Sequence, residues 1–169
     1  MQPHSLKKYF FTLFVSLFAI TSFGQKFSLE ELISLEKNSI DEFDTYVTAK
    51  GYIYLRRGME AGADVITYSY RQSDSTARKF IQKFTTPKEN SNRMITFKTN
   101  NTEDYLSIKA DLKKLGFKFK SSSDLDGDSG FTYNNGKSFE DLIIVIIIIR
   151  QKKWRNGEDG SIYEISVQL

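Results

Sequence analysis

The sequence contains no cysteine, and its only histidine is His4. Without cysteine the chain forms no disulfide and offers no thiol nucleophile, so its stability must come from packing and sheet pairing. A Ser-His-Asp triad needs an imidazole, and zinc sites are built mainly from Cys and His. If His4 is lost with an N-terminal signal, these chemistries are all excluded from the folded chain.

The first 24 residues have the pattern of a cleavable secretory signal peptide. Lys7 and Lys8 form its positive start, and an apolar segment over residues 9–23 follows. Small residues, Ser22 and Gly24, stand where a signal peptidase requires them. The apolar segment is short for a bilayer core of ~30 Å, so the pattern favours cleavage over a membrane anchor.

Cleavage before Gln25 removes His4 and two of the basic residues. The full chain has 24 Lys plus Arg against 21 Asp plus Glu, so the mature protein is close to neutral. A near-neutral chain gives no reason to expect nucleic acid as a partner. We expect an exported, non-enzymatic protein without a cofactor or a stable membrane span. The Ser-Phe-Gly-Gln ending resembles exported proteins of Gram-negative bacteria, which implies the periplasm or the extracellular space.

The remaining residues, 25–169, suit one domain with a single core. Ser28 and Ser39 each precede a glutamate by three positions, which predicts two capped helices, the second of which ends at Gly51. A third helix is expected over residues 101–115, closed by Gly116. Alternating apolar residues predict eight strands, over residues 52–57, 64–72, 77–85, 93–99, 117–121, 130–134, 139–154 and 161–169. Short polar connections favour an antiparallel meander, with a loop holding Gly58, Gly62 and Ala63 between the first two strands.

The two halves of this pattern correspond at a shift of 65 residues. The shift superposes Gly51 on Gly116, Tyr54 on Phe119 and Tyr68 on Tyr133. Order and spacing agree across the whole unit, which predicts two units, about 25–99 and 100–169. Chance similarity between two such units is the alternative.

These elements define an α+β fold, in tandem units of a helix or helix-loop-helix plus four antiparallel strands. The helices are expected on one face of the sheet. This order of elements resembles the β-lactamase-inhibitory-protein architecture. It departs from that architecture in having no disulfides and a single clear helix in the second unit. The resemblance implies a concave sheet surface that grips another protein, while the lactamase-inhibiting role itself is not carried over.

Residues 142–149 form an unbroken run of Leu, Ile and Val. β-Branched residues favour a strand, and a strand that is apolar on both faces must be covered on both. One interpretation is a central strand whose outer face meets the aromatic side chains of its neighbours. The other is an interface with a partner or with a second copy of the chain.

Aspartates alternate in the segment Asp124-Leu125-Asp126-Gly127-Asp128. Clustered carboxylates are typical of calcium loops, which makes Asp124, Asp126 and Asp128 candidate calcium ligands. The spacing of an EF-hand is not met, because Ser129 and Asn135 occupy the positions of its glycine and its bidentate glutamate. Ordinary loops are also rich in Asp and Gly.

Two groups of residues are candidates for binding. The tyrosines suit a contact surface because they offer a large area at low entropic cost. Basic residues around the only tryptophan suit anionic groups, although the solvated end of a long strand has the same composition. The tyrosines could equally form core beneath the helices. The candidates are Tyr52, Tyr54, Tyr68 and Tyr70 in the first group and Arg150, Lys152 and Trp154 in the second.

The function expected from the sequence is therefore binding to another exported or envelope protein through a sheet face. A self-associating envelope protein that uses the run 142–149 is the first alternative. A carboxylate-only enzyme is the second, and it would need two acidic groups that face each other across a cleft.

Overall fold

The structure is a computed structural model that describes residues 26–70, 79–86, 93–125, 128–136, 143–151 and 160–168. The predicted signal peptide, residues 1–24, lies outside these ranges, so its cleavage stays a prediction. The described residues form three helices and eight strands, and the α+β class is confirmed.

Both predicted capping boxes begin helices. Helix α2 spans Leu29–Lys37, and helix α3 spans Ile40–Ala49. The Ser28 hydroxyl accepts a hydrogen bond from the N–H of Glu31 at 3.1 Å, and the Glu31 carboxylate accepts one from the N–H of Ser28 at 2.7 Å. Ser39 is arranged in the same way ahead of α3. Each serine thus satisfies backbone donors that the first helical turn leaves without an internal partner.

The third helix, α4, spans Thr102–Lys114, and the Asn101 side chain caps it. The glycines predicted to end α3 and α4 both adopt positive φ, 84° at Gly51 and 78° at Gly116. A left-handed conformation after a helix costs glycine little, because it has no Cβ to clash with the backbone. The predicted ends of both helices are therefore confirmed.

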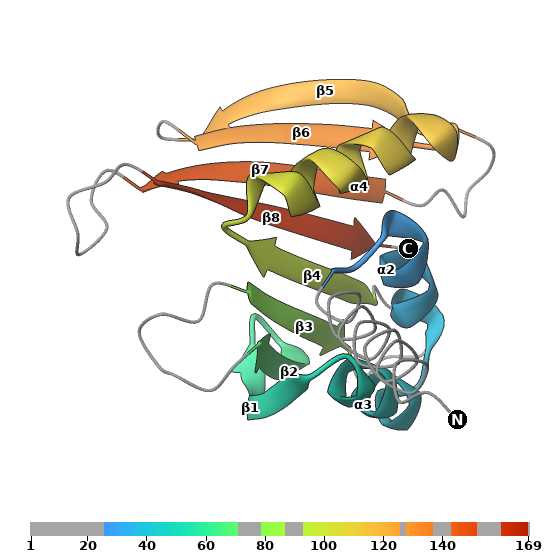
Figure 1. Cartoon of the computed structure of the whole chain (residues 1–169), viewed down its shortest axis with the longest axis vertical. Coiled ribbons are helices and arrows are strands. Elements are labelled where there is room, and N and C mark those ends of the chain that lie inside the picture. The colour runs from blue at the N-terminus through green and yellow to red at the C-terminus, as the bar shows by residue number, and fades with distance from the viewer. Residues whose placement is uncertain are drawn as a thin grey trace, which may run out of the picture.

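The eight strands form one antiparallel sheet in the order β1-β2-β3-β4-β8-β7-β6-β5 (Figure 1). Each half of the chain supplies four consecutive strands, and β4 pairs with β8 where the halves meet. Strands β1 and β5 form the two edges. The strands are β1 Tyr52–Glu60, β2 Ala63–Tyr70, β3 Lys79–Thr85, β4 Met94–Thr99, β5 Lys118–Leu125, β6 Asp128–Asn134, β7 Ile143–Gln151 and β8 Gly160–Gln168.

The outer ladders of the two halves have matching registers. Tyr54 pairs with Tyr68 in the first half, and Phe119 pairs with Tyr133 in the second. A register shift follows Tyr54 in β1 and Phe119 in β5. These positions are the ones that the 65-residue shift relates, while descent from an internal repeat stays a prediction.

The loop expected between the first two strands is wrong. Strand β1 continues to Glu60, which pairs directly with Ala63, so only two residues form the turn. Those residues, Ala61 and Gly62, have φ of 50° and 83°. Two consecutive positive φ values are typical of the tight turn whose twist matches that of a hairpin. The glycine near the strand end therefore marks a hairpin turn.

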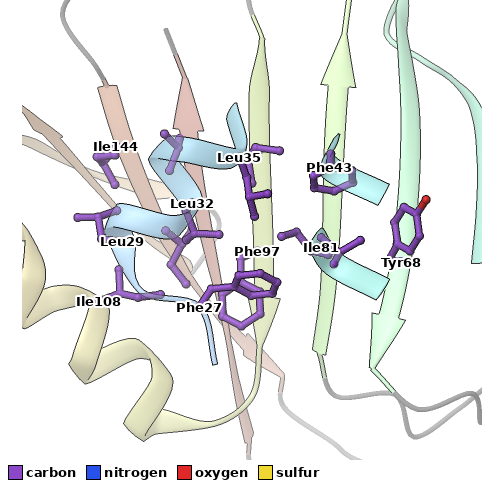
Figure 2. Close-up of a cluster of buried hydrophobic side chains, with 14 of the residues drawn as sticks. Phe27, Leu29, Leu32, Leu35, Phe43, Tyr68, Ile81, Phe97, Ile108 and Ile144 are labelled. Carbon is purple, nitrogen blue, oxygen red and sulfur yellow. The ribbon is translucent and has the colours of Figure 1, made fainter. Parts of the chain in front are cut away.

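All three helices lie on one face of the sheet, and the core fills the space between them and the strands (Figures 1 and 2). Leu32 of α2, Phe43 of α3 and Ile108 of α4 are fully buried there. The inward strand residues Ile81 and Phe97 lie opposite them across the core (Figure 2). Helices on a single face leave the other face of the sheet without a helix in the described part of the chain.

Candidate functional site

The sheet face opposite the helices is called here the open face. Its central row crosses six strands and is mostly polar. The register aligns Thr67, Gln82, Thr96, Ser166, Val145 and Thr132 in this row. The amide of Gln82 donates to the hydroxyl of Thr67 at 3.1 Å, and the hydroxyl oxygens of Thr96 and Ser166 lie 3.0 Å apart. These buried polar groups thus satisfy one another, as buried polar groups generally must.

Larger side chains on both sides of this row supply the accessible area of the open face. Phe80, Phe84, Met94 and Ile147 are half-buried, whereas four of the five polar side chains of the row, all but Thr132, are buried. Lys98 and Glu164 add one ion pair of 2.9 Å between Nζ and Oε2. Apolar side chains mixed with a few satisfied polar groups are typical of protein–protein interfaces.

The apolar run 142–149 lies in β7, an interior strand between β6 and β8; Leu142 itself is outside the described residues. Ile144 and Ile146 point into the core and are fully buried. The alternate residues Ile143, Val145 and Ile147 belong to the open face. Because both edges of β7 are already paired, this run can meet a partner only through its open-face side chains.

The four candidate tyrosines lie on the helix-covered face, not on the open face. Tyr52 and Tyr68 are core residues, with 1% and 3% of their surfaces exposed. The hydroxyl of Tyr68 donates to the carboxylate of Asp44, and burial together with this bond raises its pKa. Tyr70 is half-buried against the core, and Tyr54 is 55% exposed at the edge strand β1. The interpretation as core, left open by the sequence, describes Tyr52 and Tyr68.

The other predicted site residues are only partly within the described ranges. Arg150 lies near the end of β7, whereas Lys152 and Trp154 fall outside the described residues. Among the calcium candidates, Asp124 and Asp128 lie next to the turn of the β5–β6 hairpin. Asp126 lies outside the described residues. No group of three or more metal-ligating side chains occurs in the residues described. Calcium binding stays a prediction.

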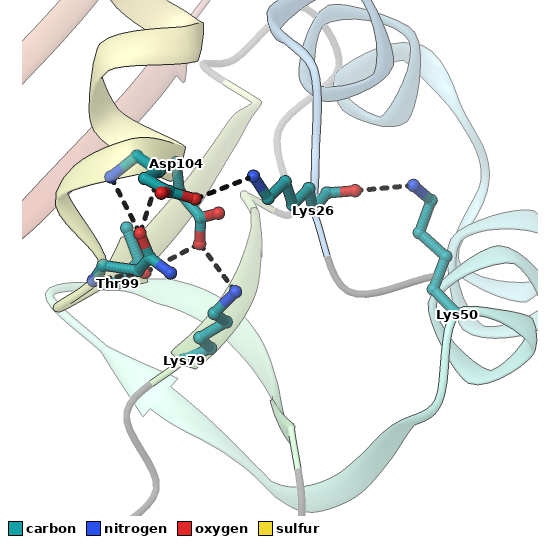
Figure 3. A network of polar contacts seen from close by, with 7 residues as sticks. Lys26, Lys50, Lys79, Thr99 and Asp104 are labelled. Atoms are coloured by element: carbon teal, nitrogen blue, oxygen red, sulfur yellow. Dashed lines mark hydrogen bonds and ion pairs between the residues drawn. The ribbon is translucent and has the colours of Figure 1, made fainter. Parts of the chain in front are cut away.

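One buried carboxylate has a structural role. Asp104 of α4 is buried, and its Oδ2 lies 2.7 Å from Lys79 Nζ and 3.0 Å from the Thr99 hydroxyl that donates to it (Figure 3). Lys79 and Thr99 belong to paired strands β3 and β4. The arrangement therefore fastens the start of α4 to the sheet.

A basic pocket between the helices and the sheet was not predicted from the sequence. It is lined by the α2–α3 turn and by strand residues, with a volume of about 340 Å³. The lining residues are Lys37, Asn38, Ser39, Ile40, Lys83, Thr85 and Arg93. One signal was present in the sequence: Lys83 comes two residues after Ile81, so both side chains point to the same face of the strand. A lysine in that register belongs beneath the helices.

Comparison with known proteins adds no indication of function to the fold, the open face and the basic pocket. No family model, curated protein or solved structure matches this chain. In the segments that the structure describes, no helix has the length and apolar character needed to cross a bilayer. The resemblance to the β-lactamase-inhibitory-protein architecture stays a prediction.

Proposed function

We propose that this chain is an exported, non-enzymatic binding protein whose working surface is the open face of its sheet. One observation carries the proposal: half-buried apolar side chains gather on a sheet face that no described element covers. Burial of such accessible apolar area by a partner lowers the free energy of the complex, because the area is removed from water. The partner is expected to be another exported or envelope protein.

The sequence supports the non-enzymatic part of the proposal. After loss of a signal peptide the chain has neither an imidazole nor a thiol, the side chains most often used as general base or nucleophile. The matching ladder registers of the two halves support a tandem arrangement of units. Such an arrangement doubles the width of the sheet, and with it the area that the open face offers to a partner.

Affinity capture from envelope extracts tests the proposal when wild type is compared with two variants. Ile147→Lys places a charge on the open face directly opposite Glu164, so the sheet itself can accommodate it. Leu106→Lys makes the same chemical change on α4, where Leu106 is exposed. A partner retained by wild type and Leu106→Lys but lost with Ile147→Lys is the expected result. Equal retention by all three proteins, or no partner at all, contradicts the proposal.

Self-association is the second candidate, and the edge strand β1 favours it. Ile53, Leu55 and Met59 on β1 are 41%, 50% and 66% exposed. Among the described strands, none pairs with the outer side of β1. An edge with unpaired backbone groups and exposed apolar side chains is a template for pairing with a second chain. Light scattering over a concentration series should then show a dimer that Leu55→Lys dissociates. A monomer at all concentrations rules this candidate out.

A further inference from the structure

The basic pocket lies where the α2–α3 turn approaches strands β3 and β4. Lys37 is the last residue of α2, Asn38 and Ser39 form the turn, and Lys83, Thr85 and Arg93 come from the strands or their ends. Its volume of about 340 Å³ is within the range of sites for small molecules. Three of these six side chains are cationic, and none of the pocket's lining residues is acidic.

The three cations have no carboxylate partner among the described residues, although they lie together in one pocket. Seven lysines and arginines elsewhere in the described chain form ion pairs with carboxylates: Lys26, Lys50, Arg56, Arg57, Lys79, Lys98 and Lys114. Lys37, Lys83 and Arg93 form none with any described residue. Like charges gathered without a direct counter-charge repel one another, and a bound anion would relieve that repulsion.

Lys83 is the innermost of the three, with only 2% of its surface exposed. Its Nζ donates to the carbonyl oxygens of Leu35 at 2.7 Å and Glu36 at 3.0 Å, near the end of α2. An ammonium has three N–H donors, so these two bonds account for two of them, and the centroid of the Phe43 ring lies 5.6 Å from Nζ. Burial lowers the pKa of Lys83 to about 8, which leaves the side chain mainly cationic at neutral pH.

Two carboxylates lie near the cations without neutralising them directly. Glu36 is fully buried, and neither of its carboxylate oxygens accepts a hydrogen bond from the described residues. Burial raises its pKa against the lowering influence of Lys83, Arg93 and Lys37. Glu42 is engaged by the N–H and hydroxyl of Ser39 at 2.8 and 2.9 Å, as the cap of α3. The cationic groups thus outnumber the acidic ones.

We propose that this pocket binds a phosphate group, either as inorganic phosphate or at the end of a small solute. Lys83 supplies a buried charge-assisted donor, and Lys37 and Arg93 close around the anion from the exposed side. A dianion with several acceptor oxygens fits three separate cationic donors better than a carboxylate does. The start of α3 adds the favourable end of a helix dipole. The site is separate from the open face, because Lys83 points to the helix-covered side of the sheet.

Calorimetric titration of the purified protein with inorganic phosphate and with glycerol 3-phosphate tests the proposal, in a zwitterionic buffer of low ionic strength. We expect a Kd of about 1 mM or tighter for at least one of them. Saturation by both indicates a site for the phosphate group itself, and preference for glycerol 3-phosphate indicates a phosphorylated solute. Equal binding of chloride or acetate at matched ionic strength, or no heat from either phosphate, overturns the proposal.

Variants connect the binding to the pocket. Arg93→Gln removes an exposed cation and should weaken phosphate binding at least about fivefold. Arg56→Gln, which makes the same change on the distant strand β1, should leave the Kd unchanged. Glu36→Gln removes a competing negative charge and keeps nearly the same side-chain shape, so it should tighten phosphate binding. An unchanged Kd in Arg93→Gln, or an equal loss in Arg56→Gln, refutes the assignment to this pocket.

Discussion

The hydroxyl oxygens of Thr96 and Ser166 lie 3.0 Å apart at the centre of the sheet, where β4 pairs with β8. Both side chains are buried, and each is the partner of the other in the ladder. Among the described strands, this ladder is the one place where the first four strands pair with the last four. The contact therefore stabilises the junction on which the width of the open face depends.

Replacing Thr96 with Val should destabilise the protein by about 1–3 kcal/mol, because the hydroxyl of Ser166 is left buried without its partner. The double variant Thr96→Val/Ser166→Ala should cost less than the sum of the two single changes, since no unsatisfied group remains. Urea unfolding of the four proteins measures both effects. Simple additivity would show that the two hydroxyls do not interact.

The division of β7 between two faces is testable with a matched pair of neighbours. Ile146→Ala should cost about 2–5 kcal/mol, because Ile146 is 1% exposed and its loss leaves a cavity beneath the helices. Ile147→Ala should cost less than half as much, since the half-buried Ile147 lies on the open face. Denaturant midpoints compare the two variants directly. Equal costs would contradict the assigned register.

Ser28 should contribute to stability through the start of α2. Ser28→Ala removes the acceptor for the N–H of Glu31, and we expect a loss of about 0.5–2 kcal/mol. Ser28→Gly should cost only about a few tenths of a kcal/mol, because glycine tolerates the position and leaves the backbone open to water. Thermal unfolding of both variants gives the comparison. No loss in Ser28→Ala would mean that α2 is held by packing alone.

Lys83 predicts a specific pH dependence of stability. Its pKa is lowered to about 8 from 10.5 by burial, with Glu36 and Glu42 opposing and Arg93 reinforcing that shift. Between about pH 8 and pH 10.5 the unfolded chain binds more protons at Lys83 than the folded chain does. The contribution of Lys83 to the free energy of unfolding therefore rises with pH in this range. Below pH 8 the lysine is protonated in both states, and its contribution is constant.

Lys83→Met lacks this titration and provides the control. In buffers without phosphate, the unfolding free energy of wild type relative to Lys83→Met should increase from pH 7.5 to about 9.5. Urea unfolding at four or five pH values is sufficient. A difference that stays constant over this range would show that the ammonium of Lys83 is not held out of water.

Local signals in the chain predicted most of the elements. Ser28 and Ser39 marked two helix starts, and Gly51 and Gly116 marked two helix ends, because caps depend on side chains within a few residues. Strand β5 was expected to end at Ser121 but continues to Leu125. The polar segment after Ser121 carries no apolar alternation, yet an edge strand needs pairing on one side only.

The candidate site was harder to predict, since strand alternation separates two faces without showing which one the helices cover. Tyr52 and Tyr68 were therefore equally compatible with a surface and with the core. Packing of Tyr52 against Phe27 and of Tyr68 against Phe43 of α3 places both in the core. The same packing places Lys83 beneath the end of α2. Such relationships depend on contacts between residues far apart in the sequence, which local patterns do not contain.

The affinity of the captured partner for wild type and for Ile147→Lys tests the central claim most directly, with Leu106→Lys as the control. A buried charge at the centre of an interface should weaken binding by at least about 30-fold, as loss of an interface hot spot does. The control on α4 should change the Kd less than about twofold, because surface substitutions away from an interface are nearly neutral. Equal affinities for Ile147→Lys and wild type would contradict the open face as the working surface.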